Sequence, residues 1–237
     1  MNKLQIAELK SFLKEVEKKE VLNEKGNMVT LKSLALTREK TVKETIKENI
    51  NPVFPIITTA LVINNRVSSA KPRQERFFKL YSNIDSLQKL KNVLDKTEPR
   101  LFLSKYLNIV SKLDDASKNP KYTLLKNLCE GFLEYKKYFK ISSDIKAMIH
   151  WADRVDIYKL REDIIGEKFL VGPAVVQNLK ITLSYDAIKG DRRVLNNLGK
   201  INIKIKAEEV DTIAKQLNIS EIYLDTLLFE YGNTKKK

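Results

Sequence analysis

The chain has 237 residues, of which 43% are hydrophobic and 31% charged, and this balance is typical of a folded globular protein of one or two domains. No apolar run approaches the roughly 20 residues that a membrane-spanning helix needs, and the first ten residues do not resemble a signal peptide. The formal net charge of +14 favours a polyanionic partner. Its excess is greatest in residues 51–130, which carry 14 basic against 7 acidic side chains.

The chain has one cysteine, Cys129, and one histidine, His150. An intramolecular disulfide and an iron–sulfur cluster held by four thiolates are therefore excluded. A zinc site would have to consist almost wholly of carboxylates. We expect no metal and no cofactor, and a structural role for His150 within a helix beside Trp151.

Taken in chain order, the strongest break is the proline-containing segment 51–55. It predicts an N-terminal helical extension of unknown role over residues 1–50 and a main domain over residues 51–237. Farther along, Asp85 is a plausible N-cap for a helix with an apolar stripe from Leu87 to Leu94, and a second stripe extends over residues 103–113.

Three more helix starts are predicted from capping residues. They are Asn119 followed by Pro120, Ser142 or Ser143, and Ser220 before the last helix, and a further stripe lies over residues 210–217. Alternation over Ile201–Ile205 predicts one short strand. The expected class is mainly α.

Residues 158–185 predict a helical hairpin. A helical segment through Ile164 and Ile165 leads into the apolar turn Leu170-Val171-Gly172, and Pro173 begins a second helix. The free backbone amides at such a helix start bind phosphate without reading base sequence. An ordinary helix–helix turn would share this pattern.

Asp191 lies nineteen residues beyond Gly172 and precedes an amphipathic segment that starts at Arg192. An aspartate in this place caps the following helix, and it can serve a catalytic role at the same time. Upstream, an apolar helix from Ala60 ends in Asn64-Asn65-Arg66, where the most basic stretch of the chain begins.

In their order and spacing these segments resemble the helix-hairpin-helix base-excision DNA glycosylase superfamily, whose closing helix is also similar to residues 220–232. Leu170 stands where that motif has its first glycine. The resemblance implies a mainly α, two-lobed fold without an iron–sulfur cluster over residues 51–237. It also implies that Asp191 is the catalytic residue, that Asn65 fills the gap left by a flipped base, and that further DNA contacts come from Asn64, Arg66, Leu170, Val171, Gly172, Ala174 and Arg192.

By the same resemblance, a damaged or mismatched base in double-stranded DNA is flipped and excised, and Asp191 stabilises the positive charge that develops on the sugar. Superfamily members that also cut the strand have a lysine where this chain has Ala174, so the resemblance implies a monofunctional enzyme. Lys168 and Lys180 lie at other positions. We expect a monomer in the cytoplasm, associated with the nucleoid. The alternatives are a non-catalytic helix-hairpin-helix DNA-binding protein, in which Asp191 is only a cap, and a basic helical RNA-binding protein.

Overall fold

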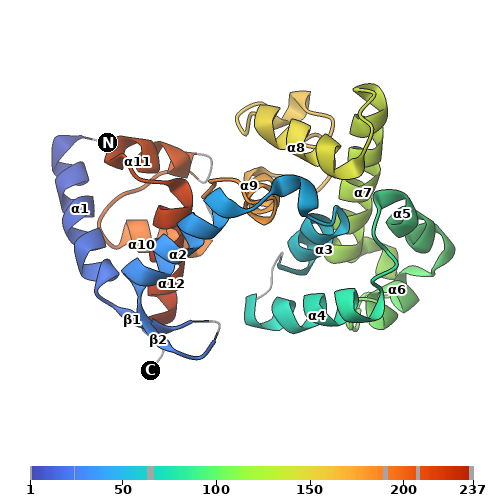
Figure 1. Ribbon diagram of the computed structural model, residues 1–237, viewed down its shortest axis with the longest axis horizontal. Coiled ribbons are helices and arrows are strands. Elements are labelled where there is room, and N and C mark those ends of the chain that lie inside the picture. Colours follow the sequence, from blue (N-terminus) through green and yellow to red (C-terminus); the bar gives the residue numbers. More distant parts are fainter. Residues whose placement is uncertain (1, 24, 63–66, 189–191, 207–208, 235–237) are drawn as a thin grey trace. The chain divides into compact units, whose positions relative to one another are not determined.

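The computed structural model is mainly helical (Figure 1) and describes residues 2–23, 25–62, 67–188, 192–206 and 209–234. In the first half of the chain the elements are α1 (Lys3–Glu17), β1 (Glu20–Leu22), β2 (Met28–Thr30), α2 (Leu31–Glu44), the 3-10 helix η1 (Lys47–Asn49), α3 (Val53–Val62), α4 (Val67–Leu80), α5 (Leu87–Lys96), α6 (Pro99–Lys105) and η2 (Ala116–Lys118). The second half contains α7 (Pro120–Tyr138), α8 (Asp144–Arg154), η3 (Leu160–Glu162), α9 (Pro173–Thr182), α10 (Arg192–Gly199), α11 (Val210–Leu217) and α12 (Glu221–Thr234).

The chain divides into two compact units, and the division differs from the expected one. Unit 1 combines residues 1–45 with residues 184–237, and unit 2 consists of residues 46–183. The first 45 residues are thus not an extension of their own, because they fold together with the C-terminal segment. Only contacts between segments far apart in the sequence create this grouping.

Unit 1 is built around α12. Helix α2 packs along α12, and α1, α10 and α11 also contact it. The β1–β2 hairpin, which pairs Val21 with Val29 in antiparallel register, leads directly into α2. Fully buried side chains of this core include Leu9, Leu31, Val194 and Leu224.

Unit 2 is organised around α3, which packs against α4, α7 and α9. The apolar run of the sequence explains this position, because seven of the ten residues of α3 are buried. Helices α5 and α8 pack against α7. Trp151 of α8 lies edge-on to Phe132 of α7, with ring centroids 5.1 Å apart. The Nδ1 atom of His150 and the hydroxyl of Tyr135 are joined by a 2.9 Å hydrogen bond.

Three of the predicted helix starts are confirmed. The Asn119 side chain caps α7 with Pro120 at the first helical position, Ser143 caps α8, and the Ser220 hydroxyl accepts a hydrogen bond from the amide of Tyr223 in α12. The predicted cap Asp85 is wrong. Ser86 caps α5 instead, and Asp85 forms an ion pair with Lys89.

Two predictions made from local periodicity are also wrong. The stripe over residues 103–113 does not continue as a helix, because α6 ends at Lys105, Asn108 takes a left-handed φ of 52°, and Val110 is 86% exposed. Residues 201–205 form no strand. Ile203 is buried, and its amide donates to the carbonyl of Leu198.

A helix that crosses a bilayer must be both long and apolar. Within the described ranges, no helix has both the length and the apolar content that a membrane span would need.

Candidate nucleic-acid interface

The segment before the hairpin turn is not helical, contrary to the predicted helix through Ile164 and Ile165. Residues 163–170 form consecutive turns that follow the short helix η3. The carboxylate of Asp163 organises them by accepting hydrogen bonds from the Gly166 amide at 2.6 Å and from the Trp151 indole at 3.0 Å. Gly166 is required here, since a Cβ atom would lie 2.6 Å from the carbonyl oxygen of Leu160.

The predicted helical hairpin is therefore wrong in its first helix, and only the second helix, α9, is present. What is called the hairpin from here on is a β-turn over residues 168–171 followed by the start of α9. The Val171 amide donates to the Lys168 carbonyl at 3.0 Å, so that Phe169 and Leu170 occupy the two corners. Leu170 has a φ of 71°, the left-handed region that favours glycine. Leu170, where the resemblance expects a glycine, therefore has a backbone conformation that glycine adopts more easily.

Helix α9 begins with free hydrogen-bond donors. Gly172 is its N-cap in an extended conformation, without a side-chain cap, and the Gly172 carbonyl accepts from the Val175 and Val176 amides. Among the described residues, neither the Gly172 amide nor the Ala174 amide has a hydrogen-bond acceptor. A Cβ atom on Gly172 would meet nothing within 4 Å, so there is open space beside the turn. Such a helix start can hold an anion.

Polar side-chain contacts join both α9 and α4 to helix α3. The side chain of Asn178 in α9 donates to Thr59 of α3 at 2.8 Å, and the side chain of Gln74 in α4 donates to Thr58 of α3 at 2.8 Å. Thr59 is 1% exposed, so its hydroxyl depends on this partner inside the core. Helix α3 thereby sets the positions of α4 and α9 within unit 2.

Lys121, in the first turn of α7, is a residue that the sequence did not single out. Its ammonium group donates to the carbonyl oxygens of Ala60 at 3.4 Å and of Leu61 at 3.2 Å, near the end of α3. Burial, together with the charge of Arg73, lowers the pKa of Lys121 to about 8. This lysine satisfies helix-end carbonyls and is held where a proton is lost easily.

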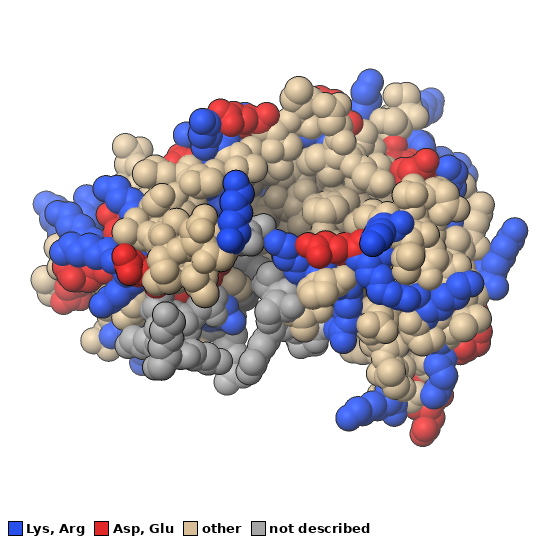
Figure 2. All heavy atoms as spheres, turned by 60° about the horizontal axis from the view of Figure 1, so that its bottom comes forward, with Lys and Arg blue, Asp and Glu red and all other residues tan. Residues whose placement is uncertain are grey.

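The α4 side of unit 2 is basic. Figure 2 turns this side forward and shows lysine and arginine side chains spread over it. Arg73, Arg76 and Lys79 form no ion pair with any described carboxylate. Arg76 donates to the carbonyl of Lys105 at 3.1 Å, and this contact fixes its position on the surface.

Four of the predicted site residues lie outside the described residues. They are Asn64, Asn65 and Arg66, which connect α3 to α4, and Asp191, which immediately precedes α10. Arg192 is the first residue of α10, and its side chain is likewise not described. A helix that begins at Arg192 agrees with the sequence-based expectation, whereas the roles of these five residues stay predictions.

The described chain that leads to residue 189 is fixed to the start of α12. The Ile188 amide donates to the Glu221 carboxylate at 3.2 Å, and the Ile222 amide donates to the Asp186 carboxylate at 2.8 Å. Burial, and then the charges of Asp211 and Asp186, raise the pKa of Glu221. On the other side, Asn197 of α10 donates to the carbonyl of Leu228 in α12 at 2.6 Å.

The two lysines of the hairpin region are not at the expected nucleophile position. Lys168 pairs with Glu134 of α7 at 2.8 Å, and this hydrogen bond raises the pKa of Lys168. Lys180 lies in the last turn of α9. Ala174, where the resemblance would place the lysine of strand-cutting members, has no amine that could form a Schiff base.

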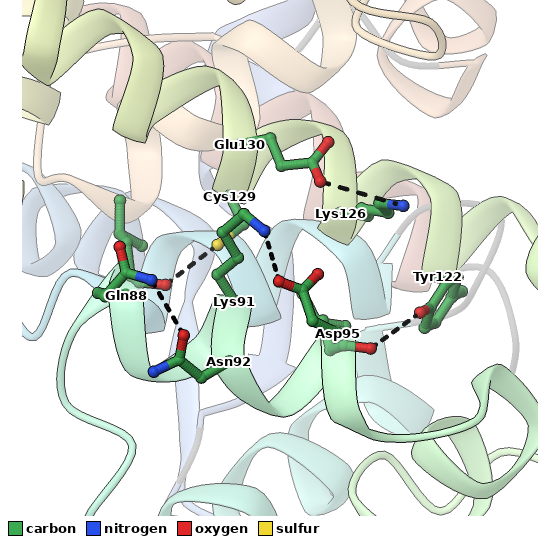
Figure 3. A network of polar contacts seen from close by, with 10 residues as sticks. Gln88, Lys91, Asn92, Asp95, Tyr122, Lys126, Cys129 and Glu130 are labelled. Carbon is green, nitrogen blue, oxygen red and sulfur yellow. Dashed lines mark hydrogen bonds and ion pairs between the residues drawn. The ribbon is translucent and has the colours of Figure 1, made fainter.

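An open surface pocket of about 800 Å³ lies against α5 and the C-terminal half of α7, with four lysines in its wall. Two of these lysines are neutralised within the unit, because Lys91 pairs with Asp95 and Lys136 pairs with Asp144. Figure 3 shows the adjoining contacts, in which Cys129 donates to the carbonyl of Leu87 and α5 is joined to α7. This network is structural.

Among the described residues no group of three or more His, Cys, Asp and Glu side chains could hold a metal ion.

Comparison of the chain with protein-family models, with curated proteins and with solved structures found no match.

Proposed function

We propose that the chain binds duplex DNA through the residues 168–174 of the hairpin and through the basic helix α4. The observation that carries this proposal is the pair of amides at Gly172 and Ala174, which have no acceptor among the described residues and adjoin open space. A phosphate group of the DNA backbone is an anion that can bind both to such amide donors and to a basic surface.

Two further features support a backbone-reading mode. The turn residues Leu170 and Val171 are apolar and cannot hydrogen-bond to base edges through their side chains, so the hairpin offers main-chain donors. Arg73, Arg76 and Lys79 add positive charge within the same unit, and α3 fixes α4 relative to the hairpin helix. The combination favours phosphate contacts along one stretch of duplex.

Binding of a fluorescein-labelled 20-base-pair duplex, measured by anisotropy over a series of salt concentrations, tests this proposal. If about four to six phosphates are neutralised, the logarithm of the affinity falls against the logarithm of the salt concentration with a slope of about −0.9 per contact. A flat salt dependence contradicts it. Competition by structured RNA that is stronger than competition by the unlabelled duplex would favour the RNA-binding alternative.

We further propose that the bound DNA is a substrate and that the chain is a monofunctional glycosylase for a damaged or mispaired base. The support for this finer proposal is the order of the hairpin, Asp191 and the helix α10 along the chain, together with Ala174 in place of a nucleophilic lysine. In that role an ionised Asp191 stabilises the cationic sugar of the transition state.

The experiment is a screen of duplexes that each carry one uracil, thymine–guanine mispair, oxidised guanine, hypoxanthine or alkylpurine, followed by alkaline cleavage of any abasic site. Release of one of these bases supports a glycosylase. Tight duplex binding without release from any of them favours the non-catalytic helix-hairpin-helix protein, with Asp191 as a helix cap only.

A further inference from the structure

Phe169, at the first corner of the hairpin turn, is exposed over 73% of its surface. Exposed aromatic side chains gain almost nothing from the hydrophobic effect, so the folding of unit 2 does not require a phenyl ring at this corner. The neighbouring corner, Leu170, takes a left-handed backbone conformation that is unfavourable for a leucine. Two apolar residues thus occupy a solvated turn where small or polar residues are the norm.

The backbone of Phe169 is nevertheless held in place. Its carbonyl accepts a 2.7 Å hydrogen bond from the side chain of Asn127 in α7. On one side of it, Lys168 is tied to Glu134 of α7 by an ion pair, and on the other the Val171 amide closes the turn. These contacts hold the backbone of Phe169 while its ring stays exposed, so a ligand that touched the ring would not have to order the backbone of the turn.

The location of Phe169 indicates the chemistry of that ligand. It lies three residues before Gly172, whose free amide and open space suit a phosphate. A ligand that meets both features must carry an anion next to an apolar surface. The strand of a nucleic acid has this pattern, because each phosphate is flanked by a deoxyribose and a base.

We propose that Phe169 packs against the deoxyribose and the exposed base edge beside the phosphate that the hairpin holds, and thus forms the apolar part of the DNA-binding surface. This inference rests on the proposed binding of duplex DNA. It adds a contact that carries no charge, and such a contact has a distinct thermodynamic signature: it contributes to affinity but not to the salt dependence.

The test compares the Phe169→Ala variant with the wild-type chain for binding to the same labelled duplex at four or more salt concentrations. Loss of one apolar or stacking contact weakens binding by about 5- to 20-fold at each concentration, with an unchanged salt slope. Phe169→Trp, which keeps an aromatic ring, retains most of the affinity. The midpoint of urea unfolding stays as in the wild type, because the side chain is exposed.

Two control variants sharpen the result. Val110→Ala changes a residue that is 86% exposed outside the hairpin, and it leaves affinity and slope unchanged. Lys79→Ala, on α4, weakens binding and makes the slope shallower by about 0.9. A Phe169→Ala variant that binds within twofold of the wild type, or whose slope changes, overturns the role of Phe169 alone. A wild-type chain that binds no duplex overturns this inference together with the proposed function.

Discussion

Replacement of Gly172 by alanine separates the stability of the hairpin from its capacity to hold phosphate. The backbone at Gly172 has φ −117° and ψ −179°, which alanine adopts without strain, and an added Cβ atom would meet nothing within 4 Å. Alanine is a poorer N-cap than glycine, which destabilises the fold by about 0.5–1 kcal/mol. Alanine also restricts the unfolded chain, which stabilises the fold by about 0.4–1 kcal/mol. The two effects offset each other, so the free energy of unfolding should change by less than about 0.5 kcal/mol.

Binding of DNA should respond differently to Gly172→Ala. The methyl group would occupy the open space beside Gly172, and if a phosphate approaches the Gly172 and Ala174 amides from that side, the methyl group would obstruct it. Loss of one charge-assisted hydrogen bond costs about 1.5–3 kcal/mol, which corresponds to about 10- to 150-fold weaker binding. Urea denaturation and anisotropy with a labelled duplex measure the two quantities on the same preparation.

Gly166→Ala is the matched control. A Cβ atom there would lie 2.6 Å from the Leu160 carbonyl oxygen and 3.0 Å from the Leu160 Cα atom, so backbone must move and the unfolding free energy should fall by about 1–3 kcal/mol. The reasoning is refuted if Gly172→Ala binds the duplex as tightly as the wild type. It is equally refuted if Gly172→Ala destabilises the chain as much as Gly166→Ala does.

Three further predictions concern individual side chains. The pKa of Lys121 is about 8 in the folded chain against 10.5 for an ordinary lysine, so between these pH values the unfolded chain binds more protons and the stability of the fold rises with pH. The wild type should therefore gain stability relative to Lys121→Met from pH 7.5 to pH 10, measured as the difference between their urea midpoints. A difference that stays constant over this range contradicts the prediction. Because Lys168 is kept protonated by Glu134, borohydride should trap no covalent adduct with an abasic duplex, whereas an adduct mapped to Lys168 or to Lys121 would exclude a monofunctional enzyme. If Asn65 fills the gap behind a flipped base, Asn65→Ala should weaken binding to lesion DNA more than to undamaged DNA, and equal losses would limit Asn65 to a backbone contact or a helix cap.

The parts of the fold that could be predicted from the sequence are those that depend on neighbouring residues. Asn119 with Pro120, Ser143 and Ser220 cap helices through contacts one turn away, and their signals are complete within a few residues. Gly172 with Pro173 likewise predicts the start of α9. Local chemistry decides these positions before any tertiary contact forms.

The predictions that were wrong are those in which tertiary packing, rather than the local apolar pattern, determines the backbone conformation. Apolar spacing continues to Leu113, but the chain leaves the helix after Lys105 and turns at Asn108. Ile203 is buried as an irregular segment of unit 1, since no neighbouring strand accompanies it in the described residues. Alternation alone could not distinguish these two environments.

The candidate interface was only partly accessible to sequence reasoning. The hairpin glycine and its helix could be placed, whereas the left-handed Leu170, the exposed ring of Phe169 and the contact of Lys121 with α3 could not. The contact of Lys121 with α3, and the Asn127 hydrogen bond to the backbone of Phe169, join segments far apart in the chain. The left-handed φ of Leu170 arises within a local turn, but no residue preference predicts it for a leucine. Likewise, the pairing of residues 1–45 with residues 184–237 leaves no signal in either segment alone.

The most direct test of base excision is single-turnover release of a base by the wild type and by Asp191→Asn, on whichever duplex of the lesion panel gives release. Asparagine is nearly isosteric with aspartate and is an equally good helix cap, so folding and duplex affinity should be retained. Loss of the carboxylate charge should slow base release by about 10²–10³-fold. Release by Asp191→Asn at the wild-type rate, or no release by the wild type from any lesion duplex, would contradict the proposed glycosylase.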